Sequence, residues 1–60
     1  MKYKVGDLVS SVGGCFIEGE VIAVEMEQGQ EILTINWTKH NTKGKINFQQ
    51  KRNESIVRLL

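Results

Sequence analysis

The sequence has 60 residues, which allows one domain near the lower size limit for folding without disulfides or metals. Its composition, 40% hydrophobic and 25% charged with a net charge of +1, argues against intrinsic disorder. The longest uncharged apolar run, Val21 to Val24, is too short to cross a bilayer. Met1-Lys2-Tyr3-Lys4 leads into a strand pattern rather than a leader, so we expect a cytoplasmic protein without a membrane partner.

Cys15 is the single cysteine, so no disulfide forms within the chain. Only His40 joins it as a soft ligand, whereas structural zinc takes four, and we expect no metal site and no cofactor. The simplest interpretation of Cys15 is a small hydrophobic residue beside a glycine corner. The small core therefore either packs unusually well or gains stability from self-association or a partner.

Alternating apolar and polar residues predict strands along the chain, while helical periodicity is poor. Residues 5–12 form the first predicted strand, which ends at the Gly13-Gly14 corner. Residues 15–27 form a long second strand, in which Gly19 favours a bulge or a sharp bend. The segment Gln28-Gly29-Gln30 is typical of a hairpin turn.

The third predicted strand, residues 31–37, has the clearest alternation in the chain. It places Leu33, Ile35 and Trp37 on one face, which we assign to the core. Residues 38–44 are polar and predict a loop that ends at a glycine corner.

The fourth predicted strand, residues 45–50, alternates with Ile46 and Phe48 facing the core. Residues 51–55 have the composition of a short turn or a single turn of 3₁₀ helix, and residues 56–60 supply the last strand. Five short strands without a helix predict one all-β domain spanning 1–60, an SH3-like five-stranded antiparallel barrel. A five-stranded OB-type barrel fits less well because it usually needs more residues.

The glycine corners and alternating strands together resemble the Tudor-like and KOW-like branch of SH3-like barrels. The resemblance implies a small module that binds peptides or nucleic acids, often within ribosomal, transcriptional or chromatin proteins. An aromatic cage for methylated side chains needs several clustered aromatics, and two of the four here are assigned to the core, so the cage is not carried over. The segments that carry the resemblance are Val5-Gly6-Asp7-Leu8-Val9, Gly19-Glu20-Val21 with Val24, Leu33-Thr34-Ile35-Asn36-Trp37 and Ser55-Ile56-Val57-Arg58-Leu59.

Charge is segregated along the chain, with a net −4 in residues 1–31 and a net +5 in residues 32–60. A basic loop with amide and imidazole donors would contact phosphates and bind in a salt-dependent manner. The alternatives are a solvated surface that balances the acidic face, or a charged surface that docks a partner or a second copy. The candidate binding residues of this basic region are Lys39, His40, Lys43, Lys45, Lys51 and Arg52.

Aromatic residues supply the second group of candidates. Trp37 would serve as a stacking platform for bases, but its place in a clean alternation favours a core anchor. Tyr3 and Phe16 lie outside such runs and are the better candidates for exposed contacts with a partner, with partial burial as the alternative for Phe16.

Features of an enzyme are scarce, because no nucleophile with a base, paired carboxylates or phosphate-binding glycine loop is present. His40 is the single histidine of the sequence. The Gly6-Asp7-Leu8-Val9 opening and Gly19 are similar to the plasmid-borne type of dihydrofolate reductase, a tetrameric small barrel, but Lys45-Ile46-Asn47-Phe48 stands where that family has Gln-Ile-Tyr. We therefore expect a stand-alone, non-enzymatic binding module of a bacterium or a bacteriophage, with no catalytic residues. Its expected partner is a protein. The alternative function is a module that binds nucleic acid, and a minor alternative is an oligomeric small-barrel enzyme.

Overall fold

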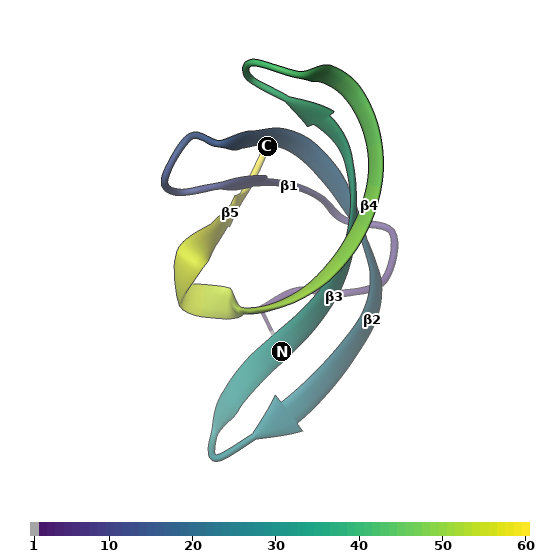
Figure 1. The fold of residues 1–60 in the computed structure, drawn as a ribbon. Helices are drawn as coiled ribbons and strands as arrows, with labels where there is room; N and C mark the ends of the chain where they lie inside the picture. The colour runs from purple at the N-terminus through teal and green to yellow at the C-terminus, as the bar shows by residue number, and fades with distance from the viewer. Residues whose placement is uncertain (1) are drawn as a thin grey trace.

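The computed structural model describes residues 2–60 and consists of a single curved antiparallel sheet (Figure 1). Its strand order is β4-β3-β2-β1-β5. The all-β class and the five antiparallel strands are therefore confirmed. Residues 2–60 contain no α-helix, and hence no helix that is long and apolar enough to cross a membrane. The elements are β1 (Leu8–Ser11), β2 (Phe16–Glu27), β3 (Gln30–His40), β4 (Gly44–Asn53), the 3₁₀ helix η1 (Glu54–Ile56) and β5 (Val57–Leu59).

The prediction of a polar loop over residues 38–44 is wrong, because β3 and β4 extend into this segment. Lys39 pairs with Lys45 in the ladder, which leaves a turn of only residues 41–43. Gly44 has a φ of 74°, a left-handed conformation that closes this short turn at little cost. Polar side chains fit here because this end of the sheet is exposed to solvent.

The last strands also differ from the expectation at their ends. β4 continues through residues 51–53, which had been assigned to a turn, and the 3₁₀ helix follows it. The side chain of Asn53 caps this helix by accepting a hydrogen bond from the Ser55 backbone N–H at 2.9 Å. The hairpin turn at Gln28-Gly29 is confirmed.

A bulge interrupts β2 around Glu18, where the register against β3 shifts on both sides, as the glycine at position 19 predicted. Gly19 lies opposite Trp37 on β3. A Cβ at position 19 would approach Cε3 of Trp37 to 2.5 Å and Cγ2 of Ile35 to 2.8 Å. Glycine is required here because the indole occupies the space of a side chain.

The core lies on the concave face of the sheet. The predicted core face of β3 is confirmed, since Leu33, Ile35 and Trp37 are all buried. Phe48 faces the same side, opposite Trp37, yet it is 46% exposed, so its assignment to the core is wrong. The reason is that β4 is an edge strand with a neighbour on one side only. The remaining buried apolar residues are Tyr3, Val9, Val21 and Val57.

Tyr3 is buried, so its prediction as an exposed contact residue is wrong. Its hydroxyl donates a hydrogen bond to the carbonyl oxygen of Val57 at 3.0 Å. The segment before β1 is held by the buried carboxylate of Glu31, which accepts hydrogen bonds from the backbone N–H groups of Lys2 and Tyr3 at 2.8 and 3.0 Å. These contacts fold the segment against the core and remove Tyr3 from the surface.

We expect Gly19→Ala to lower the free energy of unfolding by about 1–3 kcal/mol, because the new methyl group overpacks the Trp37 indole. Gly13→Ala is the matched control: its Cβ would meet only Oγ of Ser11 at 3.8 Å, and its effect stays within about 0.5 kcal/mol. Urea denaturation of both variants measures the difference. Trp37→Phe should cost less in the Gly19→Ala background than in the wild type, and additive effects of the two substitutions would contradict the proposed contact.

Candidate functional site

Phe16 is the centre of an aromatic cluster at one end of the concave face. It is the first residue of β2, where it lies opposite His40. Its ring is stacked on Trp37, with centroids 4.9 Å apart and an interplanar angle of 17°. Phe48 lies nearly parallel to it at 6.1 Å, and the His40 ring meets it edge-on at 5.2 Å. Phe16 is half-buried, so the alternative prediction of partial burial is confirmed for this residue.

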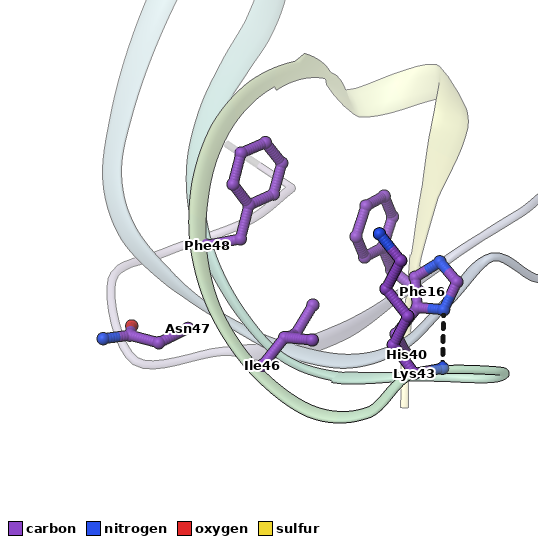
Figure 2. A pocket seen from close by; sticks show the side chains of 6 residues that line it. All are labelled: Phe16, His40, Lys43, Ile46, Asn47 and Phe48. Atoms are coloured by element: carbon purple, nitrogen blue, oxygen red, sulfur yellow. Dashed lines mark hydrogen bonds between the residues drawn. The ribbon is translucent and has the colours of Figure 1, made fainter.

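A pocket with a volume of about 280 Å³ opens over this cluster. Figure 2 shows the rings of Phe16 and Phe48 on the inner side of the β4 curve, together with the side chain of Ile46. The pocket therefore has apolar walls, and His40, Lys43 and Asn47 add polar groups to its lining.

The turn that joins β3 to β4 fixes the orientation of His40. Its Nδ1 accepts a hydrogen bond from the backbone N–H of Lys43 at 3.3 Å (Figure 2) and another from that of Thr42 at 3.2 Å. It also lies 3.1 Å from Oγ1 of Thr42. Because Nδ1 is an acceptor, the proton of the neutral ring is on Nε2. The segment around His40, residues 38–44, contains no carboxylate that could orient the imidazole. Backbone amides orient it instead.

The structure divides the lysines and the arginine that were predicted as binding residues into two groups. Lys39 and Lys45 lie directly opposite each other on β3 and β4, and Lys43 lies in the turn between them, next to the pocket. The other group, Lys51 and Arg52, pairs with the far part of β3. Lys51 Nζ also lies 3.1 Å from Oε1 of Glu25, in an exposed ion pair. The predicted residues that come together are thus Phe16, Lys39, His40, Lys43 and Lys45, whereas Tyr3, Lys51 and Arg52 lie elsewhere.

Three residues of the site, Ile46, Asn47 and Phe48, were not among the predicted binding residues. Alternation placed Ile46 and Phe48 on the correct face but could not show that Phe48 remains accessible. The signal was the composition of β4, which has only these two apolar residues among ten. Such a polar strand is typical of a sheet edge.

Residues 2–60 contain no group of three or more His, Cys, Asp or Glu side chains placed to hold a metal ion. Cys15 is exposed, next to Phe16 at the start of β2. Its carbonyl oxygen accepts a hydrogen bond from the Asn41 N–H at 3.1 Å, which ties the start of β2 to the turn beside the pocket.

Comparison with known proteins gives no relative for this chain: no protein-family profile matches it, and neither curated proteins nor solved structures show a significant match. The pocket geometry is therefore the basis for the functional proposal.

Substitutions at the two phenylalanines should have unequal effects on stability. We expect Phe16→Ala to lower the free energy of unfolding by about 2–4 kcal/mol, because this ring packs between Trp37 and Phe48. Phe48→Ala should cost about 1 kcal/mol or less, since nearly half of the residue is already exposed. Chemical denaturation measures both values. Equal losses would contradict the placement of Phe48 at the open edge of the core.

Proposed function

We propose that this protein is an SH3-like β-barrel that acts as a non-enzymatic binding module, and that its ligand is a segment of another protein. Five antiparallel strands around one core support the barrel, as does the strong curvature of the sheet (Figure 1). The Tudor-like and KOW-like resemblance agrees with a module of this type.

The observation that carries the proposal is the accessible aromatic pocket. Phe48 is 46% exposed, although it lies opposite the fully buried Trp37. Large apolar side chains that line an open hollow, with polar groups at its rim, are typical of binding sites. Aromatic residues in such pockets provide much of the free energy of binding at protein interfaces.

The size and lining of the pocket indicate what it binds. Sites for drug-sized molecules span roughly 300–1,000 Å³, and the volume of about 280 Å³ lies at the lower limit. One apolar or aromatic side chain of a peptide suits this space. Lys43 at the rim can donate hydrogen bonds to the carboxylates or carbonyl oxygens that flank such a side chain.

Selection of peptides from a random phage-displayed library against the intact protein tests this function. We expect the enriched peptides to share one apolar or aromatic residue. Phe48→Ala should weaken their affinity about tenfold or more. Met26→Ala is the control and should leave the affinity unchanged, because it removes an exposed apolar side chain of β2 beside the turn between β2 and β3. Peptides that bind the Phe48→Ala variant as tightly as the wild type would show that the pocket is not the site.

Binding of nucleic acid is a second candidate, favoured by the unpaired cations beside the pocket. Within residues 2–60, ion pairs form only between Lys2 and Glu54 and between Lys51 and Glu25. Lys39 and Lys45 therefore face each other as like charges that no ion pair compensates, an arrangement that is unfavourable in a sheet, although Glu18 lies opposite Lys39 on β2. Phosphate groups would relieve this repulsion.

Fluorescence anisotropy with a labelled oligonucleotide tests the second candidate. Contacts from Lys39, Lys43 and Lys45 predict a slope of log affinity against log salt of about −2.1 on a single strand, or about −2.7 on a duplex. Reversing Lys43 and Lys45 to Glu should abolish binding, whereas reversing Lys4 and Arg58 should not. No anisotropy change with DNA or RNA at low salt would exclude nucleic acid.

Self-association with a second copy is another form of protein partner, and an exposed apolar surface at the ends of β1 and β5 supports it. Leu60 N–H donates a hydrogen bond to the Leu8 carbonyl, and Val12 N–H donates one to that of Ile56, so these residues form two opposed pairs. All four are between 44% and 62% exposed. Two copies that covered this apolar surface would supplement the small core.

Sedimentation velocity at micromolar concentration should therefore show a dimer or a larger species. Changing Leu8 and Leu60 to Ser should shift the protein toward the monomer by removing the apolar contact, while Met26→Ser should not. A monomer that melts above about 70 °C would contradict self-association, because the isolated core would then suffice.

A further inference from the structure

We propose that the outer edge of β4 binds an acidic peptide in an extended conformation, which adds a sixth strand to the sheet and inserts one apolar side chain into the pocket. This inference rests on the proposed protein-binding function and specifies the chemistry of the partner. It combines three observations: the free strand edge, the position of the pocket on that strand, and its charge.

β4 offers a long template for strand addition. It lies at the end of the strand order, with β3 as its single neighbour in the sheet. Seven of its ten residues are exposed, and no proline interrupts it. An edge strand presents unpaired backbone N–H and C=O groups along its free side, and an added peptide strand would form hydrogen bonds with them. The other edge, β5, has only three residues, and the carbonyl of Val57 already accepts the Tyr3 hydroxyl.

The pocket lies where an added strand would need it. Ile46 and Phe48 belong to β4 itself, and both line the pocket. A neighbouring strand runs about 4.8 Å from β4, and side chains on opposed residues approach to about 5 Å. A peptide along the β4 edge would therefore place an inward-facing apolar side chain beside Phe48, while its backbone pairs with the strand.

The charge of β4 selects an acidic peptide. The strand contains three basic residues and no acidic one, and Lys43 directly precedes it. Glu25 of the acidic β2 already forms an ion pair with Lys51 across β3, on the side of β4 that faces the rest of the sheet. An acidic strand on the outer side, with its apolar residue beside Phe48, would repeat this complementarity by placing carboxylates near Lys45 and Lys51.

The same charges argue against a second copy of the chain as the occupant. Two β4 edges paired with each other would bring like cations together, which is unfavourable between adjacent strands. Lysine on an edge strand commonly prevents pairing between identical edges. The basic residues of β4 thus discriminate between partners, because they repel a second β4 and attract an acidic strand.

The direct test uses the synthetic heptapeptide acetyl-Glu-Thr-Glu-Leu-Glu-Thr-Glu-amide, titrated into the intact protein and followed by amide NMR. We expect saturable binding, with shifted and exchange-protected amides along β4 and none in the hairpin around residues 26–31. The same peptide with lysine in place of each glutamate should bind at least about tenfold more weakly.

Backbone methylation distinguishes strand addition from simple docking in the pocket. One version of the peptide carries N-methyl groups on Thr, Leu and Thr, and the other carries them on the four Glu residues. Only alternate N–H groups of an added strand point at β4, so one version should lose affinity at least about tenfold while the other retains it. If both versions bind like the parent peptide, or both lose affinity equally, strand addition is wrong.

The Phe48→Ala variant and the N-methylated peptides together separate strand addition from the pocket function on which it rests. Loss of binding in Phe48→Ala without any effect of N-methylation would retain the pocket and overturn strand addition. The reverse pattern would retain strand addition and overturn the pocket. If the heptapeptide fails to bind while library peptides bind through Phe48, the acidic-strand inference alone is wrong.

Charge reversal completes the test. Changing Lys45 and Lys51 to Glu should abolish binding of the glutamate peptide and create binding of the lysine peptide. Changing Lys4 and Arg58 to Glu, which alters the net charge equally away from β4, should do neither. Equal responses of the two double variants would overturn the role of the β4 charges.

Discussion

The Trp37 indole fills the space that a side chain at position 19 would occupy, and much of the fold depends on this contact. It requires glycine in the middle of β2 because a Cβ there would lie 2.5 Å from the ring. In a domain of this size, one aromatic residue supplies a large share of the buried apolar surface. The bulge around Glu18 interrupts the register of β2 beside the same contact.

The same indole also supports the candidate site from below, through the ring of Phe16. Phe16 stacks on it, and Phe48 lies almost parallel to Phe16 on the side of β4. The indole N–H donates to Oε1 of Gln50 at 3.2 Å, which links the ring directly to the edge strand. Core and pocket are therefore parts of one aromatic stack, in which burial decreases from Trp37 to Phe48 as the sheet reaches its edge.

Charge follows the same geometry. The acidic β2 and the basic β4 lie on either side of β3, and the ion pair between Glu25 and Lys51 crosses between them. At the opposite end of β4, Lys45 faces Lys39, which lies opposite Glu18 of β2. Neither lysine is in an ion pair within residues 2–60. Excess positive charge thus lies next to the accessible apolar side chains. An acidic ligand with an apolar residue is complementary to both features.

The sequence by itself determined the number and order of the strands, the hairpin turn at Gln28-Gly29 and the burial of Trp37, because alternation and glycine positions are local properties. It did not determine where β3 and β4 end. Only the tertiary structure decided that Tyr3 is buried and Phe48 is accessible. Alternation tells which face a side chain occupies, but not whether another segment covers that face. Such cover depends on segments distant in sequence. Tyr3 is covered because it contacts Val57. Phe48 stays accessible because no strand lies beyond β4 in the sheet formed by residues 2–60.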